Sequence, residues 1–212
     1  MKDDLLATRD KIVETTLSHA PFDGWTRGAL KAGVADLDLP PEMALRAFPG
    51  GIPDLVEHLS DWADRRMLEA LGKMDLESMR VRDRIAAGVR ARLEGLEAHR
   101  EALRRLLSYL AMPQNAPLTM RLTWRTVDAI WYAAGDNASD FNYYTKRGLL
   151  ASVYSTTVLY WLSDTSKGAS DTWSFLDRRI EGVMKVPAYK SRIKEAFSNL
   201  PRPFRIFRRQ RR

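Results

Sequence analysis

The most distinctive chemistry of the sequence lies between residues 124 and 147, where indole, phenol and carboxylate side chains recur. Trp124, Asp128 and Trp131 are spaced by four and three residues, so a helix would present them on one face, with Tyr132 beside them. A carboxylate is costly to bury without a partner, and exposed aromatic side chains beside a charge are typical of protein-binding hot spots. Two interpretations follow: Trp124 packs in the core, and Asp128, Trp131 and Tyr132 form an exposed patch that binds a partner protein.

No set of residue types in the sequence predicts catalysis. The chain has no cysteine, which excludes a cysteine nucleophile, disulfides and cysteine-ligated zinc or iron–sulfur clusters. None of its three histidines has a glutamate three residues before it, so the Glu-x-x-His pairs of a ferritin-like di-iron site are missing. Glycine-rich phosphate loops and hydrolytic triads are missing too. We therefore expect no metal, no cofactor and no enzymatic activity.

The positive charge is concentrated at the C-terminal end. The net charge is +7, and the last 22 residues carry eight basic side chains and one acidic side chain. An amphipathic helix over 188–200, followed by alternating aromatic and arginine residues, predicts binding to an anionic membrane, where each basic side chain contributes about 1 kcal/mol. Single-stranded nucleic acid and a solvated end are the alternatives. The expected membrane-binding residues are Tyr189, Ile193, Phe197, Leu200, Phe204, Arg205, Ile206, Phe207, Arg208 and Arg209.

Apolar residues recur with helical spacing through nearly the whole chain, and no segment alternates with period two. The sequence therefore predicts an all-α protein of about ten helices. They are expected near 6–23, 27–33, 41–47, 55–74, 81–96, 103–110, 118–134, 139–162, 171–184 and 188–200. Residues 148–162 are apolar nearly all round, which favours a central core helix, with a helix-to-helix dimer seam as the alternative.

The N-terminal 55 residues resemble the helix-turn-helix of TetR-type transcription regulators. A helix ends at Gly33-Val34, a short helix closes at Phe48, and a long helix follows. DNA binding needs several basic side chains for the phosphates, and Arg, Asn or Gln to reach the bases. The expected recognition helix carries only Arg46, opposed by Glu42, and residues 1–60 have a net charge of −4. We expect a vestigial helix-turn-helix that binds no nucleic acid.

The run DAIWYAAGDNASDFNYYTKRGLLASVYSTTVLYWLSD and the later DTWSFLDRRI closely resemble the ubiquinone-biosynthesis accessory proteins numbered ninth in the coenzyme Q series. The resemblance covers essentially the whole chain. It implies a TetR-regulator-like helical bundle with a C-terminal amphipathic helix, a homodimer, a hydrophobic pocket for isoprenoid or quinone lipid, and a partnership with the di-iron demethoxyubiquinone hydroxylase. In the family, an Asp and a Trp three residues later belong to the surface that meets the hydroxylase. They match Asp128 and Trp131, with Tyr132 beside them.

An isoprenoid lipid needs an elongated apolar cavity lined by aliphatic and aromatic side chains. Residues 103–112 and a facing wall at 120–124 offer such a lining, and ordinary core packing is the alternative for each residue. The expected lipid-binding residues are Leu103, Leu106, Leu107, Leu110, Met112, Met120, Leu122 and Trp124.

The sequence thus predicts a non-catalytic lipid-binding accessory protein of ubiquinone biosynthesis that presents quinone intermediates to the hydroxylase on a membrane. We expect three parts: a helix-turn-helix-like part over 1–50, a lipid-binding and dimerisation core over 51–186, and a membrane-binding tail over 187–212. Without a recognisable signal or transit peptide, we expect a cytoplasmic bacterial protein on the inner (plasma) membrane. A TetR-type ligand-responsive regulator and an enzyme acting on prenylated rings stay open as alternatives.

Overall fold

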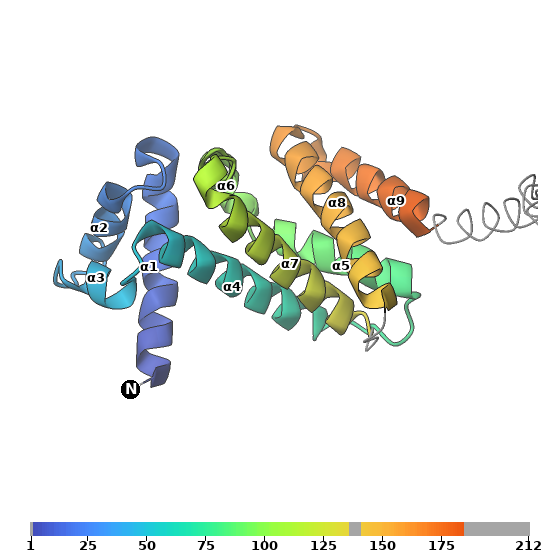
Figure 1. The fold of residues 1–212 in the computed structure, drawn as a ribbon, viewed down its shortest axis with the longest axis horizontal. Helices are drawn as coiled ribbons and strands as arrows, with labels where there is room; N and C mark the ends of the chain where they lie inside the picture. Colours follow the sequence, from blue (N-terminus) through green and yellow to red (C-terminus); the bar gives the residue numbers. More distant parts are fainter. Residues whose placement is uncertain (1, 136–140, 185–212) are drawn as a thin grey trace, which may run out of the picture.

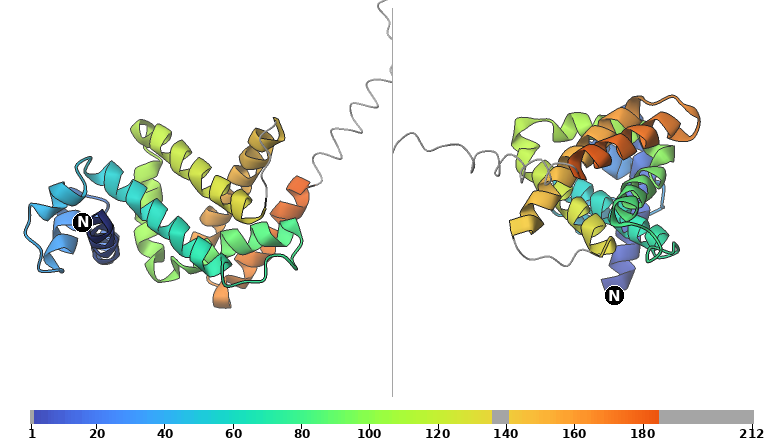
Figure 2. Two further views of the ribbon diagram at one scale, coloured as in Figure 1. Left: turned by 90° about the horizontal axis from the view of Figure 1, so that it is seen from below. Right: turned by 90° about the vertical axis from the view of Figure 1, so that its right-hand side faces the viewer.

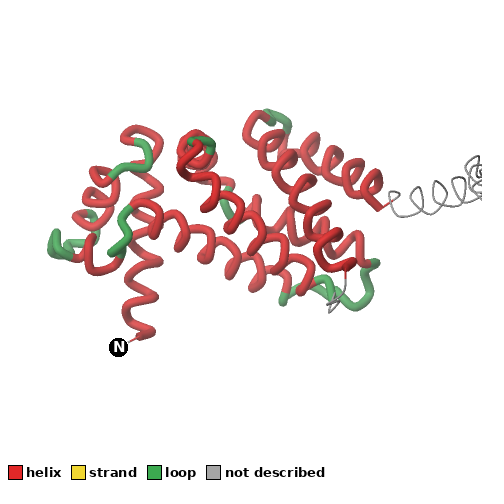
Figure 3. Tube along the Cα trace, viewed as in Figure 1, coloured by secondary structure: helices red, strands yellow, loops and turns green. Residues whose placement is uncertain are grey.

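The protein is described here by a computed structural model that covers residues 2–135 and 141–184. This described part of the chain is helical and contains no strand (Figure 3), so the all-α prediction is confirmed. The expected helix at 188–200 and the ten expected membrane-binding residues, from Tyr189 to Arg209, lie outside the described residues. The α-helices are α1 (Lys2–Asp23), α2 (Arg27–Ala35), α3 (Met43–Ala47), α4 (Ile52–Leu71), α5 (Val81–Glu94), α6 (Arg100–Leu110), α7 (Ala116–Ala133), α8 (Phe141–Ser163) and α9 (Ser170–Met184).

Helices α1, α2 and α3 lie together at one end of the molecule, and α4 leads from them into the larger body formed with α5 to α9 (Figure 1). The left view of Figure 2 shows the same arrangement, with the N-terminal helices in blue at one end and α9 in orange in the body. Helix α4 packs against α1 on one side and against α5 and α7 on the other. It is therefore the element that joins the two parts.

The N-terminal helices are held together by close packing between α1 and α2. The hydroxyl of Thr26 accepts a hydrogen bond from the amide of Ala29 and starts α2. At Gly33, a Cβ atom would lie 2.5 Å from Oγ1 of Thr16 and 2.8 Å from its backbone nitrogen. Glycine is therefore required where the two helices meet. The indole of Trp25 donates to the carbonyl of Ala102 at 2.9 Å and ties this end to α6.

Helix α8 is buried along one face only. Val153 and Trp161 are buried in the core, whereas Ser155 is exposed and Leu159 is 60% exposed. The segment 148–162 therefore contributes to the core on one side and leaves the other side open in this single chain. Among the described residues, no helix is both long enough and apolar enough to cross a bilayer.

Candidate functional site

An apolar cavity of about 240 Å³ lies inside the bundle, with walls from α4, α5, α6, α7 and α8. Helix α6 contributes four leucines spaced by three, one and three residues, and this spacing turns them all toward the cavity. Its volume is slightly below the range of roughly 300–1,000 Å³ found for pockets of drug-sized ligands. The cavity is therefore large enough for a ring or a short piece of apolar chain, but not for a whole polyprenyl lipid.

A second apolar cavity of about 340 Å³ adjoins the first. Leu110, Thr119 and Thr123 line both, so the two spaces share a wall along α7. Met120 and Trp124 complete the second cavity, and Met120 is 73% exposed. The two apolar cavities therefore lie side by side, and the second reaches the surface at Met120.

Seven of the eight residues predicted to bind lipid line one or both cavities. They are Leu103, Leu106, Leu107, Leu110 and Leu122 in the first and Leu110, Met120 and Trp124 in the second. Met112 lies in the turn after α6, is 43% exposed, and is part of neither wall. Its place outside the walls follows from the end of α6 at Leu110, after which the chain no longer follows the helical pattern. Lipid binding by these residues stays a prediction.

A buried polar cluster forms part of the wall of the first cavity. Arg92 on α5 donates from Nε to Asp64 at 2.7 Å, from Nη1 to the hydroxyl of Tyr154 at 2.7 Å, and from Nη2 to Ser60 at 3.3 Å. Thr126 donates to both carboxylate oxygens of Asp64, at 3.0 and 3.2 Å. The side chains of Arg92 and Asp64 are only 8% and 9% exposed. An ion pair so deeply buried is stable only because its remaining groups are also hydrogen-bonded.

The cluster keeps Arg92 charged and Tyr154 neutral. Burial acts to lower the pKa of Arg92, but the neighbouring Tyr154 and Asp64 outweigh burial and raise it. Burial raises the pKa of Tyr154 above its ordinary value, and Arg92 only partly offsets this effect. The phenol therefore keeps its proton.

The sequence interpretation did not include this cluster, although the sequence carries a signal for it. Arg92 falls on the buried face of α5 together with Ile85, Gly88 and Val89, at helical spacing. Asp64 lies on the buried face of α4 in the same way. A charged residue at an apolar position of a helix indicates a partner in the interior, because an unpaired buried charge is very costly.

Of the predicted partner-binding residues, Tyr132 and Asp128 lie at the surface and Trp131 does not. Tyr132 is 72% exposed, and the side chain of Asp128 is 43% exposed. Trp131 is only 7% exposed. Its indole donates to the carbonyl of Lys146 at 3.2 Å, and the ammonium of Lys146 lies 5.5 Å from the ring centre. The expectation of an exposed Trp131 is therefore wrong in the single chain, because α8 covers the indole.

Asp128 is partnered rather than isolated between two indoles. It forms an ion pair with the buried Arg147 and accepts a hydrogen bond from the hydroxyl of Tyr143 at 3.0 Å. The guanidinium of Arg147 also lies over the ring of Tyr143. These contacts offset the desolvation cost of placing a carboxylate at this position. They also fix its position at the surface beside Tyr132.

The surface beside this patch contains a further exposed aromatic residue, Tyr144, which is 65% exposed. Its ring lies 5.1 Å from that of Tyr143 and 6.1 Å from that of Trp124, measured between ring centres. Trp124 itself is half-buried. The aromatic cluster on α7 and α8 is thus partly core and partly surface, so neither of the two simple interpretations describes all of it.

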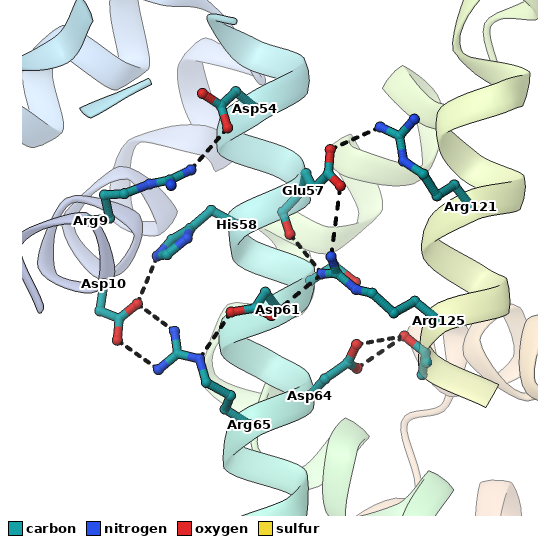
Figure 4. A network of polar contacts seen from close by, with 12 residues as sticks. Arg9, Asp10, Asp54, Glu57, His58, Asp61, Asp64, Arg65, Arg121 and Arg125 are labelled. Atoms are coloured by element: carbon teal, nitrogen blue, oxygen red, sulfur yellow. Dashed lines mark hydrogen bonds and ion pairs between the residues drawn. The ribbon is translucent and has the colours of Figure 1, made fainter. Parts of the chain in front are cut away.

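Charged side chains on α4 connect this helix to α1 and to α7 (Figure 4). His58 and Arg65 both contact Asp10 of α1, with Nε2 of His58 at 2.7 Å from its carboxylate. On the opposite side of α4, Glu57 pairs with Arg121 of α7 at 2.8 Å. Within the described residues, the ion pairs from α4 to these two helices are Arg9–Asp54, Asp10–Arg65, Glu14–Arg66, Glu57–Arg121, Glu57–Arg125 and Asp61–Arg125, and His58 adds a hydrogen bond to Asp10.

This network shifts the pKa of two groups, the carboxyl of Asp10 and the imidazole of His58. Burial opposes ionisation of Asp10, but hydrogen bonds from Arg65 and His58 outweigh it and lower the pKa of Asp10. Burial lowers the pKa of His58 below its ordinary value of 6.5, with Arg9 acting in the same direction and Asp10 against it. His58 is therefore neutral at pH 7. Arg9, Asp10 and Glu14 of α1 thus pair with side chains of α4 inside the molecule. Helix α3, which has five residues, carries a single basic side chain, Arg46.

Comparison with known proteins finds relatives in sequence. The sequence model of the COQ9 family matches residues 116–187, which contain α7, α8 and α9. The chain is 33% identical over 186 residues to the Drosophila melanogaster ubiquinone biosynthesis protein COQ9, mitochondrial, a match that covers 85% of this chain and 56% of that protein. The chain is similar to COQ9 proteins over most of its length. The rat and Dictyostelium discoideum members are 34% and 30% identical, over 83% and 87% of this chain and 58% and 62% of their own lengths.

The chain spans less than two thirds of the length of the relatives it matches. Its helical arrangement is also similar to the crystal structure of a TetR transcriptional regulator from Nitrosomonas europaea, with a TM-score of 0.68 and 22% sequence identity. That match covers 84% of this chain and 98% of the other. The predicted TetR-like fold is therefore confirmed, and at this low identity the similarity concerns the fold alone.

Proposed function

We propose that this protein is a non-catalytic accessory protein of ubiquinone biosynthesis that binds an isoprenoid quinone lipid and presents it to the demethoxyubiquinone hydroxylase. The observation that carries this proposal is the pair of adjoining apolar cavities in a chain similar to COQ9 proteins. Relatives of the chain are named as ubiquinone biosynthesis proteins. The intermediates of that pathway carry long isoprenoid chains, which are the kind of guest that an apolar region open to the surface can hold.

The physics of transfer supports a carrier role. Each buried CH₂ group is favoured by about 0.8 kcal/mol over its exposure to water. A polyprenyl chain therefore cannot cross water easily, but it moves from a bilayer into an apolar cavity at little cost, because both surroundings are apolar. The exposed position of Met120 places the second cavity at the surface, where such a transfer would begin.

The remaining parts of the proposal assign roles to the surface of the protein. The C-terminal basic segment binds an anionic membrane, a homodimer is the assembled form, and Asp128, Trp131 and Tyr132 belong to the surface that meets the hydroxylase. Tyr132 and Asp128 are the residues of this patch that a partner reaches first, since Trp131 is covered by α8. Trp131 supports the patch from beneath.

Lipid extraction from the purified protein, followed by mass spectrometry, tests the central claim. We expect a prenylated quinone or phenol to be retained by the wild-type protein and reduced by Leu110→Trp, which would fill the wall shared by the two cavities. Leu45→Trp is the matched control, because Leu45 is 70% exposed on α3, away from both cavities. Repeated extraction of no prenyl lipid from the wild-type protein would reject the proposal.

Two further measurements, of DNA binding and of substrate turnover, distinguish the rival functions. Salt-sensitive binding of duplex DNA, released by an apolar ligand, would favour a transcription regulator. Turnover of a prenylated ring by the protein alone would favour an enzyme. The pairing of Arg9 with Asp54 and of Arg65 with Asp10 argues against the first rival, because these cations are already neutralised inside the molecule.

A further inference from the structure

The wall of the first cavity combines leucine side chains with one charged group. Arg92 and its partner Asp64 both lie more than nine-tenths buried. They come from α5 and α4, while Tyr154 of α8 and Thr126 of α7 approach from the other helices. Such a cluster is not needed to fill space, because an apolar pair of similar volume is often at least as stable as a buried ion pair. Its place in a cavity wall is consistent with a role in binding.

The cluster has hydrogen-bonding capacity that the protein itself does not use. A guanidinium has five N–H groups, and within the described part of the chain Arg92 donates three hydrogen bonds, one from each nitrogen. One N–H group on each terminal nitrogen therefore remains available. The hydroxyl of Tyr154 accepts from Arg92, which leaves its own proton free to be donated. Both side chains line the cavity.

We propose that Arg92 and Tyr154 form a head-group site that hydrogen-bonds a neutral ring oxygen of the bound lipid, such as a quinone carbonyl or a phenol. This inference rests on the proposed function and adds the orientation and chemical class of the guest. The positive charge of Arg92 is already balanced by Asp64 at 2.7 Å. A carboxylate or phosphate would therefore bring an uncompensated negative charge into an apolar site. A neutral acceptor uses the free donors without that cost.

The position of the cluster also fixes the direction in which the isoprenoid chain of the bound lipid runs. Thr126, which contacts Asp64, lies six residues after Met120 on α7, a separation of about 9 Å along the helix axis. Thr123, between the two levels, and Thr119, next to Met120, line both cavities. The ring thus lies inside at Arg92, and the isoprenoid chain extends past Leu110 toward Met120.

Calorimetric titration of the full chain with three probes of equal chain length tests this inference. The probes are a decyl-substituted 1,4-benzoquinone, decylbenzene, which lacks the ring oxygens, and decanoate. We expect the wild-type protein to bind the quinone at least about tenfold more tightly than decylbenzene, since hydrogen bonds to a charged donor are the stronger kind. Decanoate should bind more weakly than the quinone.

The decisive variant is the double substitution Asp64→Leu with Arg92→Met, which removes both charges together and avoids leaving one of them unpaired. It should lose most of the preference for the quinone over decylbenzene, with Tyr154 left as the single remaining donor of the site. Tyr154→Phe should reduce the preference for the quinone by several fold. Arg82→Met is the matched control, because Arg82 is exposed on the same helix and should leave the preference unchanged.

Each outcome separates this inference from the function on which it rests. Equal binding of quinone and decylbenzene by the wild-type protein would overturn the head-group site and leave lipid carriage intact. Tighter binding of decanoate than of quinone would overturn the choice of a neutral guest. Binding of none of the three probes would overturn the proposed function as well. If the double variant does not fold, an undiminished preference in Tyr154→Phe decides against the site.

Discussion

The buried pair of Asp64 and Arg92 makes a quantitative prediction about stability. In Arg92→Met, Asp64 would keep its two contacts with Thr126 but lose the cation 2.7 Å away. The carboxylate would then be charged and unpaired in the interior. Asp64→Leu leaves the guanidinium in the same position. We expect each single variant to be strongly destabilised and the double variant, which removes both charges, to be far less affected.

The sizes of these effects follow from the burial of the two side chains. Removing one partner of a buried ion pair costs about 3–5 kcal/mol, whereas replacing both by apolar groups is often neutral. The double variant also leaves Ser60 and Tyr154 without their contacts to Arg92, at about 1 kcal/mol each. For a protein of this size, each kcal/mol lowers the melting temperature by about 2–4 °C. Each single variant should therefore melt about 6–20 °C below the wild-type protein.

Urea unfolding followed by circular dichroism at 222 nm measures these free energies, with the slope against urea checked for each variant. The reasoning would be refuted if each single variant cost less than about 1 kcal/mol. It would also be refuted if the double variant lost as much stability as the two single variants combined, since coupled partners are not additive.

Three other predictions concern the partner surface, a buried histidine and a helix contact. Tyr132→Ala should weaken recruitment of the hydroxylase, measured by pull-down, without changing the unfolding free energy. Trp131→Ala should cost about 3–5 kcal/mol of stability in urea unfolding, because the indole is buried. Unchanged recruitment by Tyr132→Ala would contradict the assignment of Tyr132 to the partner surface. Burial lowers the pKa of His58 below 6.5, so on acidification the imidazole is protonated in the unfolded chain before it is protonated in the folded one. The contribution of His58 to stability is therefore fully present above about pH 6.5 and falls as the pH drops. The stability of His58→Gln should decline less steeply between about pH 7 and 5, and an equal decline would be evidence against a buried neutral imidazole. Gly33→Ala should destabilise the protein by about 1–3 kcal/mol, since its Cβ would meet the backbone of Thr16 at 2.8 Å; an unchanged melting temperature would show that α1 and α2 can separate freely there.

The helices could be predicted from the sequence because their signals are local. Apolar residues at helical spacing mark each buried face, and breaks such as Gly24 and Pro113 lie between helices in the structure. The lining of the cavities was predictable for a similar reason, since the leucines of α6 share one face. Met112 lies outside both cavity walls because the helix ends two residues before it.

Contacts between distant segments were not predictable in the same way. The spacing of Trp131 and Tyr132 on α7 says nothing about which of them a neighbouring helix covers. Lys146 of α8, fifteen residues later, decides that Trp131 is buried and Tyr132 is not. The pairing of Asp64 with Arg92 joins residues 28 positions apart. The sequence showed two charges at apolar positions, and only the fold shows that they meet.

The ion pairs along α4 have a mechanical consequence. Asp54, His58 and Arg65 hold this helix to α1, while Glu57 and Asp61 hold it to Arg121 and Arg125 of α7 (Figure 4). Each exposed pair contributes little by itself, but a tilt of α4 in either direction would stretch several of them at once. The ion pairs on both sides of α4 therefore resist a tilt of this helix between the cavities and the N-terminal end. A rearrangement of the helices around the cavities would therefore have to break several of these ion pairs before it reached the N-terminal helices.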